Sequence, residues 1–407
     1  MPRTRSHTLP APVRSSPPTA LDIGKVENDH VVFENWRGAA DLPQQDPPAF
    51  TPPDQRTGFA IMGLGRLALG EILPAFAETL HSKPTALISG HPDKARAVAK
   101  QYGIPDHAIY DYSSIRRIAD NPEIDAVYIV TPNGLHPEHL AAVVATGKPV
   151  LCEKPMSNTL EDAILMDTLC REAGVKLMIA YRCQYEKYNR AVIDLTQGGQ
   201  LGKPRLIEAT NTQMQGPADQ WRMKPGMAGG GSLPDIGLYC LNGARNVIGE
   251  DPEEVFAWTF SPTGDSRYTD IDETTAFMLR FPSGAIANCA TSYGAHESKD
   301  MRVRLENGWI SLENAFAYQG QRLFVARRDG DHESVSEWRI DAGNQFALEI
   351  DHFADCIRNN REPRTPGSEG IRDQILMTAL YESARTGRPV RTDTALRARG
   401  LTPKTVS

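Results

Sequence analysis

The sequence predicts an α/β protein whose first half is a helix-covered parallel sheet and whose second half is an α+β domain with a large open, mostly antiparallel sheet. At 407 residues the chain is too long for one ordinary hydrophobic core. From Phe59 to about Ala180, short apolar stretches alternate with helical patterns of ten or more residues, which indicates a parallel sheet covered on both faces. After Ala180, strand-like stretches follow one another with turn signals such as PSG and ENG between them, which indicates an antiparallel sheet.

These patterns divide the chain into four segments. Residues 1–57 hold ten of the 30 prolines and almost no periodicity, which is typical of an extended arm. Residues 58–180 form the first domain, from the strand FAIMGLG to the strand VKLMIA. Residues 181–390 form the second domain, with two helical stretches around 343–360 and 370–387 after its strands. Residues 391–407 are a C-terminal tail.

Composition excludes several classes of function. A net charge of −7 argues against nucleic acid and anionic membranes as partners, and no apolar run is long enough to span a bilayer. The six cysteines are scattered without a CxxC pair, which suits reduced thiols. The His136 and His139 pair in HPEH does not have the HExxH spacing, so we expect no metal site. The first 57 residues lack the apolar core of a signal peptide, so we expect a cytoplasmic protein, or a periplasmic one if an export signal was removed.

A glycine-rich turn follows the first strand of the parallel sheet. In GLGRLA, residues 63–68, Gly63 permits a tight turn and Gly65 lets a pyrophosphate approach the backbone, while Ala68 stands where a third glycine is usual. The helix that follows supplies N–H donors and the positive end of its dipole. In this strand–turn–helix context the pattern predicts a Rossmann domain that binds a dinucleotide.

The end of the second strand, ALISG, favours NADP over NAD. A free 2′-hydroxyl is usually held there by Asp or Glu, but Ser89 occupies the position and Arg66 and Lys94 stand nearby. A hydroxyl and two cations would attract a 2′-phosphate. Asp93 opposes this preference, although we expect it to cap the next helix.

The stretch GGGSLPDIGLYCLNG, residues 229–243, has two interpretations. Ser232 followed by Asp235 fits a capping box at a helix start, which would be purely structural. Alternatively, the three glycines let the chain lie close to a ligand, and the helix behind them presents Asp235 and Tyr239 to it. The two roles do not exclude each other for Asp235.

Together the motifs resemble the glucose–fructose oxidoreductase / inositol dehydrogenase / rhizopine-catabolism (Gfo/Idh/MocA) superfamily, and most of all its glucose–fructose and aldose–aldose oxidoreductase branch. The resemblance spans about residues 58–390 and rests on GLGRLALGEILPAF, TPNGLH, EKP, YRCQYE, WRM and GGGSLPDIGLY. It implies a Rossmann domain followed by an open-sheet domain, with catalytic residues Lys154, Asp235 and Tyr239. Many members have His where this chain has Tyr239. A proline-rich arm that helps to hold the cofactor is also a feature of that branch.

The resemblance also implies a set of binding residues. We expect substrate to meet Lys154, Arg182, Asp235 and Tyr239, with Glu153 positioning a substrate or cofactor hydroxyl. Arg182, Trp221 and Arg222 would flank the nicotinamide or ribose; the alternatives are ordinary packing for Trp221 and surface charge for the arginines. The expected cofactor contacts are Gly63, Leu64, Gly65, Arg66, Leu67, Ser89, Gly90, Lys94, Tyr112, Thr131, Pro132, Asn133, His136, Glu153, Lys154, Arg182, Trp221 and Arg222.

The predicted function is an NADP-dependent sugar oxidoreductase with tightly bound cofactor. It would oxidise an aldose at C1 to an aldonolactone and reduce a second sugar to an alditol, with ping-pong kinetics. Tyr239 would be the base, with its pKa lowered by the ammonium of Lys154, and Asp235 would position the sugar or the Lys–Tyr pair. The alternatives are an ordinary NADP-dependent aldose or polyol dehydrogenase that exchanges its cofactor, and a non-catalytic NADP sensor. We expect a homo-oligomer, a dimer or tetramer formed through the open sheet.

Overall fold

The computed structural model describes residues 25–27, 30–32 and 50–401. In the first unit of the chain, residues 1–49, β1 (Lys25–Glu27) pairs antiparallel with β2 (His30–Val32). Most of the predicted arm, and the last six residues of the predicted tail, lie outside the described residues. The tail also contains a short helix, α10 (Asp393–Ala398).

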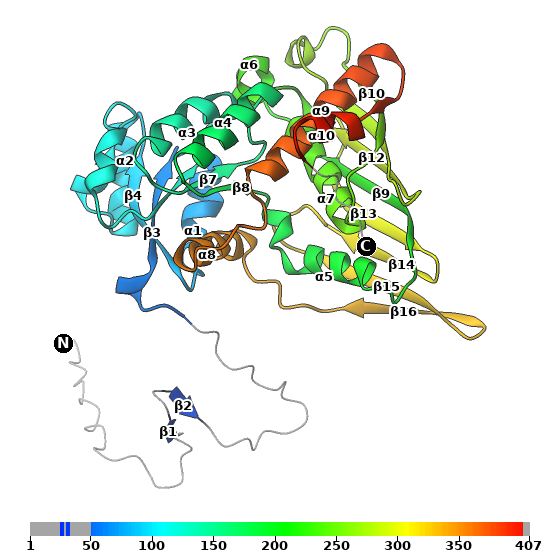
Figure 1. The fold of residues 1–407 in the computed structure, drawn as a ribbon, viewed down its shortest axis with the longest axis horizontal. Coiled ribbons are helices and arrows are strands. Elements are labelled where there is room, and N and C mark those ends of the chain that lie inside the picture. Colours follow the sequence, from blue (N-terminus) through cyan, green and yellow to red (C-terminus); the bar gives the residue numbers. More distant parts are fainter. Residues whose placement is uncertain (1–24, 28–29, 33–49, 402–407) are drawn as a thin grey trace, which may run out of the picture. The chain divides into compact units, whose positions relative to one another are not determined.

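The second unit begins with a six-stranded parallel sheet in the order β5–β4–β3–β6–β7–β8, the doubly wound order of a Rossmann domain (Figure 1). The strands β3, β6, β7 and β8 are buried along their whole length, because helices cover both faces. The strands are β3 (Thr57–Met62), β4 (Ser82–Ile88), β5 (Ile109–Tyr110), β6 (Ala126–Ile129), β7 (Val150–Glu153) and β8 (Leu177–Ala180). The helices are α1 (Leu73–Ala75), α2 (Pro92–Tyr102), α3 (His136–Val144) and α4 (Leu160–Glu172).

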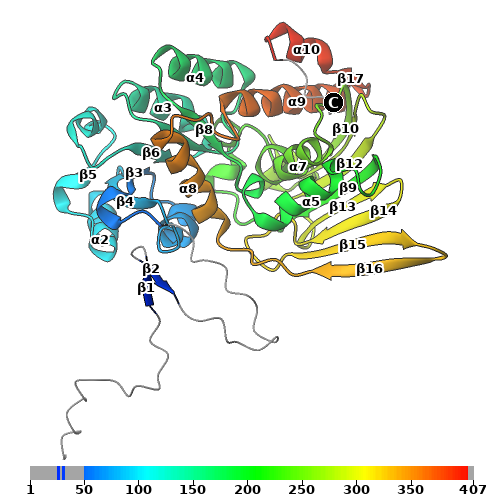
Figure 2. The ribbon, with the colours of Figure 1, turned by 60° about the horizontal axis from the view of Figure 1, so that its bottom comes forward.

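A nine-stranded sheet follows, in the order β16–β15–β14–β13–β9–β12–β11–β10–β17 (Figure 2). Only the β9–β12 pair is parallel, so the predicted fold class is confirmed. The edge strand β16 was not expected from the sequence, because HESVSEW is polar and six of its seven residues are exposed. The strands are β9 (Pro204–Thr212), β10 (Glu254–Phe260), β11 (Thr274–Arg280), β12 (Ile286–Ser292), β13 (Ser298–Leu305), β14 (Gly308–Glu313), β15 (Arg322–Asp329), β16 (His332–Trp338) and β17 (Val390–Arg391).

Helices α5 (Lys187–Gln197), α7 (Leu238–Ile248) and α9 (Gly367–Thr386) cover one face of the large sheet, and none of the described helices lies on the other face (Figures 1 and 2). Helix α8 (Gln345–Arg358) packs instead against the Rossmann sheet. There the carboxylate of Asp351 accepts hydrogen bonds from Leu80 N, His81 N and Ser82 Oγ. Helix α9 contacts both α4 and β10, so this one helix packs against elements of both domains.

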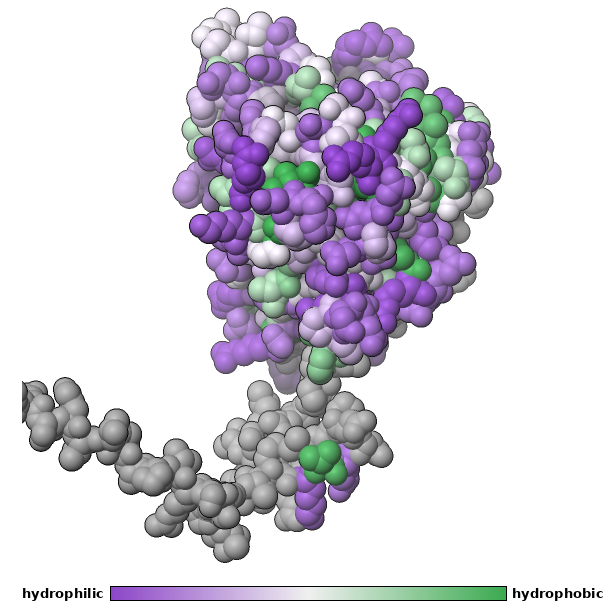
Figure 3. Space-filling view, turned by 90° about the vertical axis from the view of Figure 1, so that its left-hand side faces the viewer, coloured by the Kyte–Doolittle hydropathy of each residue, from purple (hydrophilic) through white to green (hydrophobic). Residues whose placement is uncertain are grey.

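The outer end of the Rossmann domain is covered mainly by hydrophilic side chains, with small apolar patches between them (Figure 3). This is what a parallel sheet enclosed by amphipathic helices leaves at its surface. Among the described helices, none is both long and apolar enough to cross a membrane.

Candidate active site

The first turn of the Rossmann domain fits a dinucleotide phosphate. Gly63 has φ of +99°, and a Cβ there would lie 2.8 Å from Thr131 Cγ2, so the turn admits only glycine. A Cβ on the exposed Gly65 would meet nothing within 4 Å, which leaves open space above the turn. The first helical bond runs from Leu69 N to Gly65 O, so the preceding N–H groups are available to an anion. Leu64 and Leu67 turn their side chains into or against the core, so they offer only backbone.

The end of β4 presents the groups expected around a 2′-phosphate. Ser89 Oγ accepts from His91 N at 3.2 Å, and Lys94 Nζ donates to Leu64 O at 2.9 Å, which ties α2 to the glycine turn. Arg66 is exposed beside this turn. The partly exposed ring of Tyr112 lies against Gly90 and stacks on His139 at 4.8 Å.

The expectation that Asp93 caps α2 is wrong. The N-cap residue is His91, without a side-chain capping bond, and Asp93 pairs with Arg96 at 2.5 Å in the exposed first turn. The carboxylate of Asp93 is therefore bound to Arg96 and not to the end of β4, where a carboxylate would repel a phosphate.

The loop TPNGLH after β6 is locked onto the loop after β7. His136 is fully buried: its Nε2 lies 2.9 Å from Thr131 O, and its Nδ1 lies 3.2 Å from the carbonyls of Pro155 and Met156. Burial lowers the pKa of His136 to about 4, so the imidazole is neutral. The expected direct cofactor contact of this side chain is therefore wrong, and His136 fixes the loop instead.

Other side chains of this loop also bind protein groups. Thr131 Oγ1 lies 2.9 Å from His139 Nδ1, and Asn133 Nδ2 donates to Ala228 O at 3.1 Å, while Pro132 is half-buried at the start of the turn. The described residues contain no group of three or more His, Cys, Asp or Glu side chains that could hold a metal ion.

The glycines of GGGS approach protein atoms closely. A Cβ on Gly231 would lie 1.7 Å from Asp272 O, and one on Gly230 would lie 2.3 Å from the hydroxyl of Tyr381. The carboxylate of Asp272 accepts from Gly231 N at 2.9 Å and from Ser232 Oγ at 3.2 Å. A side chain at either position would therefore collide with Asp272 or Tyr381, while Gly229 and Gly230 also line a cavity of about 770 Å³.

The capping-box interpretation is also wrong. In the described chain Ser232 makes no side-chain cap, because its hydroxyl is bound to Asp272. The helix opens instead with a wide turn, Leu233–Gly237, which leads into α7. This leaves the carboxylate of Asp235 free to face other groups.

Asp235 is the centre of a charged cluster. Its Oδ2 accepts from Arg222 Nε at 3.0 Å and from Tyr293 Oη at 2.7 Å, and its Oδ1 lies 3.3 Å from Lys154 Nζ. Lys154 also donates to Asp235 O at 2.7 Å. Burial alone would raise the pKa of Asp235, but Arg222 and Lys154 hold it well below its usual value. The carboxylate is therefore ionised and rigidly placed.

Tyr239 lies one turn further, among two cations. Arg182 Nε donates to its hydroxyl at 3.1 Å, and the ammonium of Lys154 lies 4.7 Å from the centre of its ring. Burial raises the pKa of Tyr239 well above its usual value, and Arg182 opposes this shift. The prediction that Lys154 lowers the pKa of the phenol is thus wrong: Arg182 is the cation at the oxygen, and the phenol is the resting form.

Arg182 is held from several sides. Its Nη2 donates to Phe316 O at 2.7 Å, its Nη1 binds Gln345 Oε1, and its guanidinium stacks 4.6 Å from the ring of Tyr318. The side chain is buried, so Arg182 is neither a surface charge nor an exposed group that could flank a ribose. Arg222 is half-buried and stacks 4.5 Å from the ring of Trp221, so these two residues form one wall beside Asp235.

Glu153 faces the interior, not a ligand. Its Oε1 accepts from Tyr128 Oη at 2.8 Å and its Oε2 accepts from Lys154 N at 3.1 Å. Glu349 Oε2 lies 3.5 Å from the same phenol, while Oε1 has no hydrogen-bond partner among the described residues. Burial raises the pKa of both acids, and for Glu349 the charge of Glu153 adds to the effect. The expected binding role of Glu153 is therefore wrong: its carboxylate accepts a hydrogen bond from the backbone of Lys154 and helps to hold that residue in place.

Sequence reasoning missed Tyr293, Gln345 and Glu349. Tyr293 follows β12 and Gln345 begins α8, so both lie far in sequence from the residues that they position. Gln345 and Glu349 lie in a stretch with an ordinary helical pattern. The only signal for them in the sequence is that they are polar residues on a face of this helix that is otherwise apolar.

Comparisons with known proteins find relatives that match most of the chain. Residues 57–181 match a family model described as an oxidoreductase family with an NAD-binding Rossmann fold (GFO_IDH_MocA), and residues 189–311 match the GFO/IDH/MocA C-terminal domain. D-xylose 1-dehydrogenase (NADP(+)) of Haloarcula marismortui is 32% identical over 348 residues, which cover 84% of this chain and 95% of that protein. 1,5-anhydro-D-fructose reductase of Ensifer adhaerens is 26% identical over 83% of this chain and 99% of its own length. The crystal structure of aldose–aldose oxidoreductase from Caulobacter crescentus, complexed with glycerol, superposes with a TM-score of 0.79 at 40% identity and covers 83% of this chain and 99% of that one.

Proposed function

The chain belongs to the GFO/IDH/MocA family of oxidoreductases with an NAD-binding Rossmann fold, and from that premise we propose that it is an NADP-dependent oxidoreductase of sugars, of the aldose–aldose type. The observation that carries the proposal is the convergence of Lys154, Asp235 and Tyr239. Lys154 follows β7 of the Rossmann sheet, Asp235 lies in the wide turn before α7 and Tyr239 lies in the first turn of α7. Lys154 joins the other two through a hydrogen bond to Asp235 and a contact with the ring of Tyr239. The 40% identity with aldose–aldose oxidoreductase supports the aldose as donor.

In the proposed reaction, an aldose loses hydrogen from C1 and becomes an aldonolactone. NADP, when bound, accepts and returns the hydride. Tyr239 takes the proton of the donor hydroxyl, and Arg182 stabilises the phenolate that this requires. Lys154 donates to a sugar hydroxyl, and Asp235 keeps Lys154 and Arg222 in place.

The second half-reaction uses the same groups in reverse. A sugar carbonyl enters the site, and the phenol of Tyr239 protonates its oxygen as the alditol forms. The neutral phenol that burial favours is the form that this step needs. Ser89, Arg66 and Lys94 lie around the end of β4, and among the described residues no carboxylate binds Ser89 or Lys94. These groups support NADP over NAD.

One alternative has its own support. D-xylose 1-dehydrogenase is matched over 84% of this chain, which favours an enzyme that exchanges its cofactor at each turnover. The proline-rich arm would be the segment that retains the cofactor in the first case, and most of it lies outside the described residues.

The experiment that separates the two is a spectrum of the purified protein without added cofactor. Glucose or xylose is mixed in, and the near-ultraviolet band of reduced nicotinamide is recorded. We expect a band stoichiometric with protein that a second sugar erases. A band that forms only after NADP is supplied, and grows with each turnover, identifies the exchanging dehydrogenase. A protein that forms no band with any aldose, with or without NADP, contradicts both.

A further inference from the structure

An exposed aromatic ring borders the candidate active site. Tyr318 lies in the loop between β14 and β15, and 47% of the residue is exposed. The guanidinium of Arg182 lies 4.6 Å from the centre of its ring, and the ring of Phe346 meets it edge-on at 5.3 Å. A single exposed aromatic residue is common on protein surfaces, so its surroundings decide what it does.

The loop that carries this ring is pinned at several points. Gln345 Nε2 donates to the backbone carbonyl of Tyr318 at 2.6 Å and to that of Ala317 at 3.1 Å. At the start of the loop, Asn314 O accepts from Ala317 N at 3.0 Å, and the Asn314 side chain donates to Gly320 O at 2.9 Å. An aromatic ring that is already held in place loses little conformational entropy when a ligand covers it.

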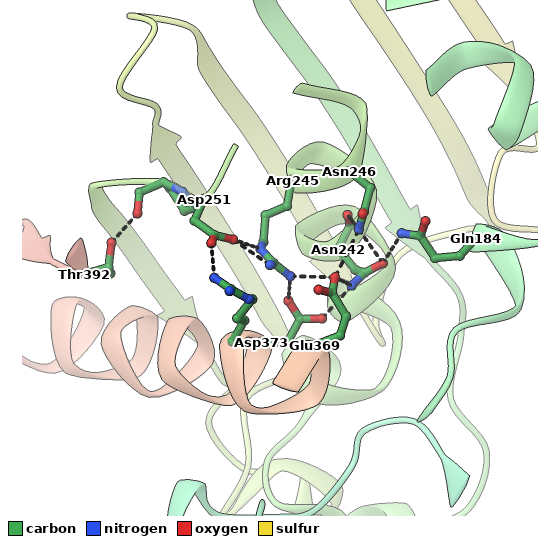
Figure 4. Close-up of polar contacts among 10 residues, drawn as sticks. Gln184, Asn242, Arg245, Asn246, Asp251, Glu369, Asp373 and Thr392 are labelled. Carbon is green, nitrogen blue, oxygen red and sulfur yellow. Dashed lines mark hydrogen bonds and ion pairs between the residues drawn. The ribbon is translucent and has the colours of Figure 1, made fainter. Parts of the chain in front are cut away.

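Arg182 holds this ring beside the proposed acid–base residue. Its guanidinium carbon lies 4.6 Å from the ring centre of Tyr239 and 4.6 Å from that of Tyr318. The short helix that contains Arg182 is tied to α7, because Gln184 Nε2 donates to Asn242 Oδ1 at 2.7 Å (Figure 4). The exposed ring of Tyr318 and the ring of Tyr239 are therefore held one side chain apart.

The two proposed half-reactions use different forms of a sugar. A lactone keeps the ring of the aldose, so oxidation at C1 takes the pyranose form. An alditol is acyclic, so the reduction that produces it takes the open-chain carbonyl form. A pyranose chair with mainly equatorial hydroxyls presents axial C–H groups on its flat faces, and such an apolar face packs well on an aromatic ring. An open-chain sugar has no face of this kind.

We propose that Tyr318 is a specificity-determining residue whose exposed ring stacks on the pyranose ring of the donor aldose. This role rests on the proposed function, which supplies the aldose and places its C1 hydroxyl at Tyr239. Lys154 and Tyr239 bind the reacting end of the donor, and Tyr318 binds a face of its ring. The open-chain acceptor uses Lys154 and Tyr239 without the stacking contact. Tyr318 therefore acts on binding and takes no part in proton transfer.

The test compares the binding of one cyclic and one open-chain polyol. 1,5-Anhydro-D-glucitol is a pyranose without the C1 hydroxyl, and D-glucitol is its open-chain counterpart. Neither has a carbonyl group, so neither reacts with the protein loaded with NADPH. Both are titrated calorimetrically into wild type and Tyr318→Ala. We expect the variant to bind 1,5-anhydro-D-glucitol about tenfold more weakly, and D-glucitol less than about twofold more weakly.

Phe50→Ala is the matched control for the loss of an exposed ring. Phe50 is 63% exposed and precedes β3, and its neighbour Thr51 donates its N–H to Leu80 O before β4. It therefore lies toward the amino ends of the Rossmann strands, away from the site at their carboxyl ends. We expect this variant to bind both polyols as the wild type does.

A kinetic comparison separates stacking from an indirect effect through Arg182. Stopped flow follows cofactor reduction by aldose and its reoxidation by the second sugar. Tyr318→Ala should raise the KM for the donor aldose about tenfold and leave both limiting rates within about twofold, and Tyr318→Phe, which keeps the ring, should restore the KM. Limiting rates that fall in both half-reactions would mean that Tyr318 only positions Arg182, and would overturn the proposal.

Failure of the proposed function has a different signature. A wild type that reduces no cofactor with any aldose refutes that function, whereas the polyol titrations need no turnover. A wild type that binds 1,5-anhydro-D-glucitol no more tightly than D-glucitol overturns the stacking role. A Tyr318→Ala protein that loses affinity for both polyols equally, or for neither, also overturns it.

Discussion

The region that begins at the wide turn before α7 carries two charged clusters that combine the same chemical groups in opposite proportions. At its start, the single carboxylate of Asp235 meets two cations, and the Arg222 side chain is 34% exposed. Near its end, Arg245 is 0% exposed and meets three carboxylates. The cations around Asp235 have access to solvent and leave donors for a substrate, whereas the sealed cluster around Arg245 has no such access. The first cluster therefore suits chemistry, and the second holds α7 against α9.

The largest expected effect is the loss of the sealed cluster. Arg245→Met would leave three buried carboxylates without their shared cation, and we expect the free energy of unfolding to fall by about 3–5 kcal/mol. Arg222→Met is the matched control, because water can solvate Asp235 there; we expect a loss of about 1 kcal/mol or less, with most activity gone. Denaturant unfolding of both variants measures the difference. Similar losses in the two variants would mean that the clusters do not differ as their burial implies.

The next effect is on rate alone. Tyr239→Phe should lower turnover by about 10²–10⁴-fold, because the acid–base group is gone. Its stability should change by only about 1 kcal/mol, since one hydrogen bond from Arg182 is lost. Tyr293→Phe is the comparison: this hydroxyl acts through Asp235, so we expect about a tenfold loss or less. A Tyr239→Phe protein that binds cofactor and keeps nearly full rate would contradict the assignment.

The fold was predictable because its signals are local. The alternation of buried strands with helices, and GLGRLA at a strand end, follow from hydrophobic periodicity and from glycine geometry at Gly63. The polar edge strand β16 has no such pattern, since it is paired on one side and exposed. Helix α8 is predictable as a helix, but its packing against the first sheet depends on Asp351 binding backbone far away in sequence.

The site was predictable only as a list of residues. Lys154, Asp235 and Tyr239 were correctly expected to come together. Which cation touches which oxygen was not predictable, because Arg182 and Lys154 are both cations in the sequence and only packing decides that Arg182 faces the phenol. The same holds for Ser232, whose capping pattern is overridden by Asp272, a partner forty residues away.

A smaller effect tests how firmly the open cluster depends on charge. In Asp235→Asn the two cations lose their shared carboxylate, and we expect activity to fall about 10–100-fold through misplacement. The pKa of Asp235 is depressed in the folded state, so its contribution to stability is present above the unfolded value of about 3.9 and is lost as pH falls through the folded pKa. The difference in Tm between wild type and variant should therefore shrink as pH is lowered into the acid range. A difference that does not change with pH would mean that the lost stability is not electrostatic.

The smallest effect comes from acids that have no cation bound to them. Glu349 shares the phenol of Tyr128 with Glu153, and its pKa is raised well above normal by burial and by Glu153. A raised pKa in the folded state favours folding at low pH, and that contribution is lost as pH rises through the folded value. Glu349→Gln removes this penalty and supplies N–H donors toward the carboxylate of Glu153. We expect a gain of about 1 kcal/mol at alkaline pH that disappears in acid, which is the opposite trend to Asp235→Asn. Thermal unfolding of both variants over one pH series measures the two slopes, and parallel slopes would refute the distinction between cation-rich and cation-poor clusters.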